Sequence, residues 1–248
     1  MNRARGSWRL LRTALHVCAG LATILFRFPA LSPAQRQDSV HRWSATLLER
    51  LGVALQVHGQ PQAAGPLMIV ANHISWLDIS ALHAVQYCRF IAKADLKHWP
   101  VIGLMSARAG TLFIERESRR DAMRVVHHMA DSLRAGDVVA VFPEGTTGDG
   151  STVMPFHANL FQAAISAGAK VQPLLIQYVD VKSGRPSTAA SYIGDEVFLT
   201  SVWRTLCTPG LAVRIFLGEP QPVKDRHRRT LAAQMRDAVS ALSALTTP

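Results

Sequence analysis

From residue 52 onward, short continuous runs of apolar residues alternate with longer segments of helical periodicity. The runs at 67–71 and 138–142 contain no charged residue, which is typical of strands buried on both faces of a parallel sheet. We expect strands at residues 53–58, 67–71, 89–92, 111–114, 138–142, 171–179 and 212–217, and helices at 78–87, 118–134, 156–168 and 230–245, with a helical or irregular segment at 96–108. The alternation predicts an α/β fold with a mainly parallel central sheet flanked by helices.

The first 50 residues follow a different pattern. Arginines at positions 3, 5, 9 and 12 precede an uncharged run at 13–26. Its 14 residues are fewer than the roughly 20 that span a bilayer. Arg27 stands where the cleavage site of a signal peptide would begin. We therefore expect a helix that lies in the membrane interface or dips into one leaflet. An amphipathic helix at 35–51 follows, and for this helix core packing and membrane contact are both open.

The predicted organisation is a basic, membrane-associating helical segment at 1–50 followed by an α/β domain at 51–248. Because a basic flank favours the cytoplasmic side, we expect the protein at the cytoplasmic face of the inner membrane. The net charge of +10 indicates attraction to polyanions such as anionic lipid or a phosphorylated substrate. Nucleic acid is not expected, because the basic residues are spread along the chain and no recognition motif is present.

Three cysteines, at positions 18, 88 and 207, are odd in number and far apart in the chain. This count predicts neither a disulfide framework nor a zinc site, and it is consistent with a reducing compartment. We expect no cofactor and no metal.

Candidate chemistry begins directly after the apolar run at 67–71, where His73 precedes Asp78 by five residues. In an ideal helix five residues turn through about 500°, so the two side chains would point about 140° apart. The pair can meet only if His73 lies in a turn and Asp78 on the helix that follows, with Ser75 as a plausible N-cap. Such a pair is either a general base with its orienting carboxylate or a structural hydrogen bond at a strand end.

Three more segments lie where strands are expected to end. The segment 110–116 delivers Arg116 after one strand, and 142–147 presents Glu144 in a proline turn after another. The strand at 171–176 contains Pro173. In open α/β sheets ligands bind beyond the carboxyl ends of the strands, so one cleft can contain His73, Arg116 and Glu144.

These four segments, in this order, resemble the motifs NHxxxxD, GxxFIxR, FPEGT and a proline-containing strand of the 1-acyl-sn-glycerol-3-phosphate acyltransferase family. The resemblance covers residues 51–217 and implies that 51–248 is an acyltransferase domain. It also implies that His73 takes the proton from an acceptor hydroxyl while Asp78 orients the imidazole. The hydroxyl oxygen then attacks the thioester of an acyl-CoA or acyl-carrier protein, and the thiol leaves. The expected partners are this donor, a lysolipid acceptor and the membrane surface.

The resemblance assigns five further residues to the acceptor. Arg116 and Lys93 would hold a phosphate, Glu144 would contact hydroxyls, and Gly145 and Thr146 would complete the site, with backbone amides near Gly145 as donors to the oxyanion. Three alternatives stay open: an ion pair of Arg116 with Glu115, Glu117 or Asp121, a structural turn role for Glu144, and a solvated surface position for Lys93.

Two departures from the family pattern bear on the acceptor. The family commonly continues FPEGT with Arg-Ser, whereas the residues after Thr146 here are Thr147, Gly148, Asp149 and Gly150. A later Phe-Lys-x-Gly pattern is replaced by Phe-His-Ala-Asn at 156–159. Both differences resemble the subgroup that acylates lyso-ornithine lipid. We expect 1-acyl-sn-glycerol-3-phosphate as acceptor, giving phosphatidic acid, with lyso-ornithine lipid as the alternative.

Three other classes of protein fit the sequence less well. A serine hydrolase would need Ser75, His73 and Asp78 as a triad, yet no G-x-S-x-G elbow is present. A metal enzyme would draw on His73, Asp78 and His83 with the pair at 127–128, but no H-E-x-x-H motif is present and adjacent histidines on a helix point in different directions. A non-catalytic membrane-binding protein would have no use for the His73–Asp78 pair.

Overall fold

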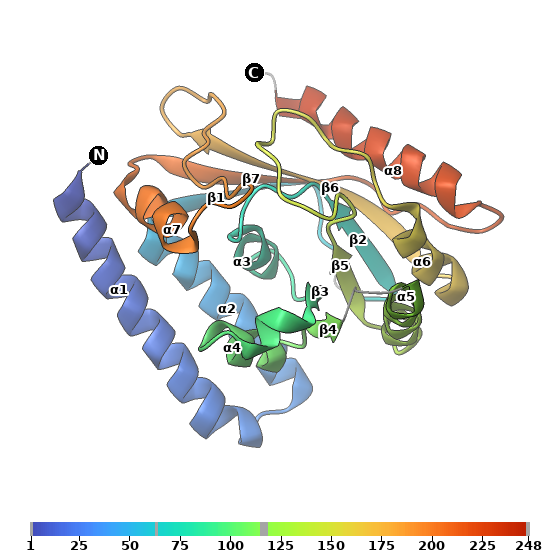
Figure 1. Cartoon of the computed structure of the whole chain (residues 1–248), viewed down its shortest axis with the longest axis horizontal. Helices are drawn as coiled ribbons and strands as arrows, with labels where there is room; N and C mark the ends of the chain where they lie inside the picture. Colours follow the sequence, from blue (N-terminus) through green and yellow to red (C-terminus); the bar gives the residue numbers. More distant parts are fainter. Residues whose placement is uncertain (1, 63, 115–118, 247–248) are drawn as a thin grey trace.

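A mixed sheet of seven strands runs through the middle of the molecule (Figure 1). The computed structural model describes residues 2–62, 64–114 and 119–246. The strands are β1 (Val53–His58), β2 (Leu67–Ala71), β3 (Arg89–Lys93), β4 (Leu112–Ile114), β5 (Val138–Val141), β6 (Lys170–Asp180) and β7 (Leu211–Leu217), in the spatial order β1-β7-β6-β2-β5-β3-β4. The predicted strands are all present, with ends that differ by one residue at most.

The strand directions make the sheet mostly parallel. β2 pairs in parallel with both β5 and β6, β3 pairs in parallel with β5, and β4 with β3. β7 runs antiparallel to β6, and β1 runs parallel to β7. The prediction of a mainly parallel sheet is therefore confirmed, with β1 and β7 reversed at one edge. The five co-directional strands end at the same edge of the sheet, which positions the turns described below.

Helices cover both faces of the sheet, as predicted. They are α1 (Arg3–Ala22), α2 (Pro33–Leu51), α3 (Asp78–His83), α4 (Ile102–Arg108), α5 (Arg119–Arg134), α6 (Phe161–Ala167), α7 (Phe198–Cys207) and α8 (Arg228–Ala241). The segment 96–108 divides into a 3-10 turn, Ala94–His98, and α4. α7 is not among the predicted helices, and the Ser118 at the expected start of α5 lies outside the described residues.

The central strand β2 is buried on both faces, because side chains of alternate residues enter two separate cores. Leu67, Ile69 and Ala71 pack in the core beneath α2, α3 and α7. Met68 and Val70 pack in the core beneath α5, α6 and α8. This two-sided burial is the physical reason that the strand reads as a continuous apolar run.

The N-terminal helix is longer than the uncharged run predicted. α1 continues through a π turn and a 3-10 turn, and Arg3–Ala30 is one helical segment of 28 residues, long and apolar enough by length and composition to cross a membrane. One face of α1 packs along α2 and α7 (Figure 1). Gly6 and Gly20 lie so close to the side chains of Cys207 and Trp43, respectively, that a Cβ at either position would overlap them.

The histidine at the end of α3 makes the fold sensitive to acid. His83 is buried, its Nε2 hydrogen-bonds the Cys88 carbonyl at 2.9 Å, and burial lowers its pKa from 6.5 to about 4. Because His83 is protonated in the unfolded chain at a higher pH than in the folded protein, it lowers the free energy of unfolding as pH falls below 6.5. The loss is about 2 kcal/mol at pH 5. We expect urea unfolding to show that loss, and a His83→Gln variant to lose less stability between pH 8 and pH 5. An equal loss in both proteins would contradict this account.

Candidate active site

The turn after β2 is tied to its neighbouring strand by a buried amide. Asn72 donates from Nδ2 to the Ile176 carbonyl at 3.0 Å and accepts at Oδ1 from the Ile176 N–H at 2.8 Å. This pair of hydrogen bonds continues the β2–β6 ladder for one residue beyond the strand. His73 follows directly, so its backbone position is set by the sheet.

His73 and Asp78 meet in the geometry that the spacing required. Asp78 is the first residue of α3, is 0% exposed, and its Oδ2 accepts from His73 Nδ1 at 2.7 Å. The same oxygen accepts from the N–H groups of Ile74 at 2.8 Å and Ser75 at 3.0 Å. The turn thus wraps around the carboxylate, and the charge stays compensated inside the protein.

Ser75 is not the N-cap of the helix, so that expectation is wrong. α3 begins at Asp78 with Leu77 in the N-cap position and no side-chain cap. The Ser75 hydroxyl is fully buried, accepts from the Leu77 N–H and donates to the Ala190 carbonyl. Because this hydroxyl is directed at Ala190 and not at His73, the geometry also argues against a hydrolase triad.

Sequence reasoning missed a fourth donor to Asp78. The Tyr178 hydroxyl, on β6, donates to Asp78 Oδ1 at 2.7 Å. Burial, and then the Asp78 charge, raises the pKa of Tyr178 well above its usual value of 10, so the phenol remains protonated. The available signal was a tyrosine in a largely buried strand, since a buried hydroxyl needs a partner.

The His73 ring is held by stacking and keeps one nitrogen accessible. Its centroid lies 4.0 Å from that of Phe142 with an interplanar angle of 8°. The side chain is 21% exposed, and Nε2 makes no hydrogen bond to any residue that the structure describes. Because the Asp78 carboxylate accepts a hydrogen bond from Nδ1–H, the neutral ring carries its proton on Nδ1 and its lone pair on Nε2. This arrangement allows Nε2 to accept a proton.

Glu144 links two loops rather than facing an open site. It is 6% exposed, Oε2 accepts from the His73 N–H, and Oε1 accepts from the Met154 N–H, each at 2.8 Å. Burial raises the pKa of this carboxyl, while the two N–H donors act in the opposite direction. Both oxygens are thus committed to backbone groups. This geometry favours the structural turn role over contact with acceptor hydroxyls.

A Glu144→Gln variant separates these two roles. The amide retains one acceptor and turns an NH₂ group toward a backbone donor, so we expect a loss of about 1–3 kcal/mol in the free energy of unfolding. We also expect kcat to fall more than acceptor KM rises. Glu49→Gln, at an exposed position on α2, is the matched control. A rise in acceptor KM with unchanged stability would contradict the structural role.

In the turn after β5, an amide that was expected to face the substrate donates a hydrogen bond within the turn itself. The Gly145 N–H donates to the Phe142 carbonyl at 3.1 Å, so it is not available for an oxyanion. Gly145 has φ of +73°, and a Cβ there would lie 3.0 Å from the His157 ring, which accounts for glycine at this position. Thr146 is exposed, and within the described parts of the chain its N–H has no hydrogen-bond acceptor.

Of the two cations expected at the acceptor phosphate, only the backbone of Lys93 belongs to the part of the chain that the structure describes. Lys93 ends β3 and pairs with Ile114 of β4, while Arg116, with its alternative ion-pair partners Glu115 and Glu117, lies outside the described residues. A cavity of about 340 Å³ lies between the 3-10 turn after β3, the strand β4 and the first half of α5. Its lining includes Lys97, His98, Phe113, Asp121, Arg124 and His128. The lining also includes Ala94, which follows β3 directly, so the cavity lies at the carboxyl end of this strand.

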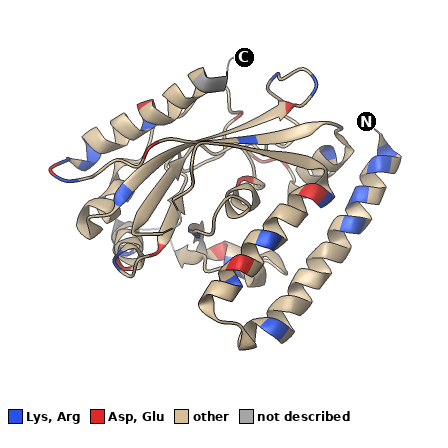
Figure 2. Cartoon of the chain, turned by 180° about the vertical axis from the view of Figure 1, so that it is seen from behind, with Lys and Arg blue, Asp and Glu red and all other residues tan. Residues whose placement is uncertain are grey.

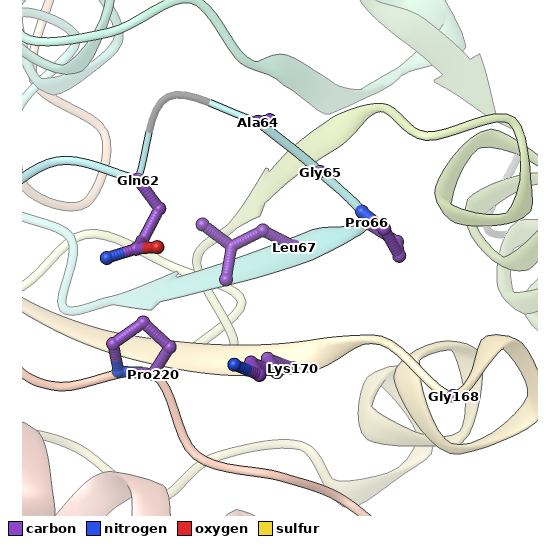
Figure 3. Close-up of a pocket in the computed structure, with 8 residues that line it drawn as sticks. All are labelled: Gln62, Ala64, Gly65, Pro66, Leu67, Gly168, Lys170 and Pro220. Carbon is purple, nitrogen blue, oxygen red and sulfur yellow. The ribbon is translucent and has the colours of Figure 1, made fainter.

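A second cavity lies away from this chemistry. It measures about 260 Å³ and is lined by residues at the amino ends of β2 and β6, among them Leu67 and Lys170 (Figure 3). His73 follows the opposite end of β2. The described residues also contain no group of three His, Cys, Asp or Glu side chains placed to hold a metal ion.

Comparisons with known proteins agree with the motif resemblance. Residues 54–177 match the family model described as Acyltransferase. A protein of Neisseria meningitidis named 1-acyl-sn-glycerol-3-phosphate acyltransferase is 36% identical over 215 residues, 86% of this chain and 83% of that one. A protein of Pseudomonas aeruginosa named lyso-ornithine lipid O-acyltransferase is 37% identical over 204 residues, 82% and 78% of the two chains.

The fold has a solved counterpart as well. The crystal structure of the 1-acyl-sn-glycerophosphate acyltransferase from Thermotoga maritima superposes with a TM-score of 0.67 at 19% identity, covering 97% of this chain and 98% of that one. The chain belongs to the acyltransferase family. Within it, the protein is an acyltransferase of the glycerolipid and lysolipid type.

Proposed function

We propose that the protein transfers an acyl chain from a thioester donor, an acyl-CoA or an acyl-carrier protein, to the free hydroxyl of a lysolipid, with His73 as general base. The observation that carries the proposal is the 2.7 Å hydrogen bond from His73 Nδ1 to the buried Asp78 carboxylate. Nε2 takes the proton from the acceptor hydroxyl, whose oxygen bonds to the thioester carbonyl carbon. The C–S bond then breaks, and the imidazolium returns the proton to the leaving thiolate.

Asp78 has a distinct part in this step. As Nε2 gains a proton, the ring becomes positively charged next to a carboxylate that is already hydrogen-bonded and needs no reorganisation. No covalent acyl-enzyme is required, because a thiolate is a good leaving group. The Thr146 N–H is the amide that we propose for the oxyanion.

Lysophosphatidate is the acceptor that we propose first. Lys97, Arg124, His98 and His128 line a cavity at the same sheet edge as His73, and Arg124 lies 3.4 Å from Asp121. A phosphate monoester is suited to such a cavity, with Lys93 and Arg116 as further contacts. The Neisseria relative carries the corresponding name.

Lyso-ornithine lipid is the second candidate, because of one feature of the loop after Thr146. The Gly148 N–H donates to the His73 carbonyl at 2.8 Å, so this loop lies against the catalytic turn. Thr147 stands where the family has its arginine, and the exposed Asp149 lies two residues further along the same loop. A carboxylate there attracts the amine of an ornithine headgroup and repels a phosphate. The Pseudomonas relative is named for this acceptor.

The experiment that tests the function offers purified protein palmitoyl-CoA or palmitoyl-acyl-carrier protein with each acceptor in turn. We expect diacyl product from lysophosphatidate, detected by mass spectrometry. Product from lyso-ornithine lipid alone would replace the first acceptor with the second. Absence of product from every donor and acceptor pair would overturn the proposal of acyl transfer.

We also propose that residues 1–50 attach the protein to the cytoplasmic face of the membrane. The N-terminal helical segment carries exposed apolar side chains along its length, namely Trp8, Leu11, Leu15, Leu25 and Phe26. The first acidic residue is Asp38, so α1 carries positive charges alone (Figure 2). Because another face of α1 packs along the domain, we propose that the helix lies in the interface plane.

A double variant, Leu15→Glu with Phe26→Glu, tests this attachment. Burying a large apolar side chain is worth about 1.5–3 kcal/mol, so we expect binding to vesicles containing anionic lipid to weaken at least about tenfold. Sedimentation with vesicles measures the effect. Met123→Glu, at an exposed apolar position on α5, is the matched control and should bind like the unaltered protein. Unchanged binding of the double variant would contradict the proposal.

A further inference from the structure

The Asp78 carboxylate has two differently bonded oxygens. Oδ2 accepts three donors from its own turn, those of His73, Ile74 and Ser75. Oδ1 accepts the Tyr178 hydroxyl, from a strand one hundred residues further along the chain. The turn holds one oxygen through local contacts, and only β6 reaches the other among the hydrogen bonds of the described residues.

Resting on the proposed role of His73, we propose that Tyr178 is a positioning residue that tunes the basicity of His73 through Asp78. The phenol and the His73 ring bond to different oxygens of the carboxylate between them, so the phenol acts through that carboxylate. Its hydrogen bond fixes the plane of the carboxylate and withdraws negative charge from it. Asp78 then stabilises the imidazolium less than an unbonded carboxylate does.

Tyr178 is suited to this role because it stays a donor. It is 3% exposed and sits in the core beneath α2, α3 and α7. Its raised pKa, caused by burial and by the Asp78 charge, keeps it protonated throughout the working range of an imidazole base. Other titratable groups against this assembly are Glu144, on the His73 N–H, His157, against Gly145, and Asp149, on the loop bonded to the His73 carbonyl.

The test is a Tyr178→Phe variant, which keeps the ring and removes the donor. With one fewer hydrogen bond, Asp78 stabilises the imidazolium more strongly, so His73 becomes a stronger base. We expect the acidic limb of the kcat/KM profile to move up by about one pH unit, a loss of about tenfold at pH values below the limb. Above the limb, where His73 is deprotonated in both proteins, we expect equal activity. The acceptor KM should not change.

A merely structural role gives a different result, namely a loss of activity that is the same at every pH. That outcome, or an unshifted profile, would overturn the proposal. Tyr87→Phe is the matched control, because the Tyr87 hydroxyl donates to the Ala109 carbonyl at 2.9 Å, away from Asp78. It should leave the acidic limb in place.

A second measurement covers the case in which the variant is poorly active or less stable. Titration of the His73 ring by NMR, with its signal assigned from a His73→Ala sample, reads the pKa directly and separates it from titration of Glu144. We expect a higher pKa in Tyr178→Phe and a lower one when fluorotyrosine, a stronger donor, replaces Tyr178. Equal His73 pKa values in all three proteins would contradict the proposal. If His73→Ala retains activity, the proposed general base fails instead, whatever the titration shows.

Discussion

A His73→Ala variant is expected to lose acyl transfer by about 10²–10⁴-fold in kcat while retaining its fold. An alcohol is a weak nucleophile at neutral pH, and a placed general base typically contributes a factor of this size. The ring is 21% exposed and stacks on Phe142, so its removal leaves the Asn72 and Asp78 hydrogen bonds to the backbone in place. Initial rates at saturating donor and acceptor measure the effect.

The control for this variant is His127→Ala, at an exposed position on α5. It removes a histidine of the same chain without touching the turn after β2, and its kcat should match that of the unaltered protein. A His73→Ala enzyme that keeps its melting temperature and more than about a third of its activity would show that another group takes the proton.

An Asp78→Asn variant is expected to be the second most damaging change, with kcat reduced by about 10²–10⁴-fold. The amide oxygen can still accept from His73 and the turn, and its NH₂ group can donate to the Tyr178 oxygen. The negative charge that stabilises the imidazolium is absent, so His73 becomes a weaker base. The acidic limb of the pH profile should therefore move down, opposite to its movement in Tyr178→Phe.

Asp131→Asn provides the comparison, since Asp131 forms an exposed ion pair with Arg134 on α5 and lies outside the site. Its rate and pH profile should be unchanged. An Asp78→Asn variant with normal kcat and an unmoved limb would reduce the Asp78 carboxylate to a structural group, and the general-base mechanism would then rest on His73 alone.

The sheet was predictable because its central strands are buried on both faces. Short uncharged apolar runs such as 67–71 and 138–142 are typical of such strands, and their observed ends agree within a residue. The reversed direction of β7 was not predictable, because a long connection that contains a helix, here α7, commonly joins parallel strands. Sequence reasoning also missed α7. α7 buries Ser201 and Thr205, which bond to the carbonyls of Ser191 and Ala189 and interrupt the apolar periodicity.

The candidate site was predictable as far as local spacing determines geometry. The five-residue interval from His73 to Asp78 allowed only a turn followed by a helix, and the structure has that arrangement. Contacts set by tertiary structure were not predictable in the same way. Tyr178 reaches Asp78 only because β6 lies beside β2. The Gly145 amide donates to the Phe142 carbonyl within its own turn.

The length of the N-terminal helix could not be predicted from the local sequence pattern either. The uncharged run at 13–26 predicts too short a helix, because the arginines before it belong to the same helix. Arg9 lies within α1 and donates to the carbonyls of Leu206 and Thr208. Its charge is therefore accommodated by the end of α7, a contact that only the tertiary structure supplies.

The most direct test of the central claim measures transfer of a labelled acyl chain from acyl-CoA to lysophosphatidate and to lyso-ornithine lipid, in parallel for the unaltered protein and His73→Ala. Intact-protein mass spectrometry of the same reactions without acceptor tests for an acyl-enzyme. The account predicts labelled diacyl lipid from the unaltered protein only, with no acylated protein in either sample. Equal product from both proteins, or an acylated protein that goes on to form product, would contradict it.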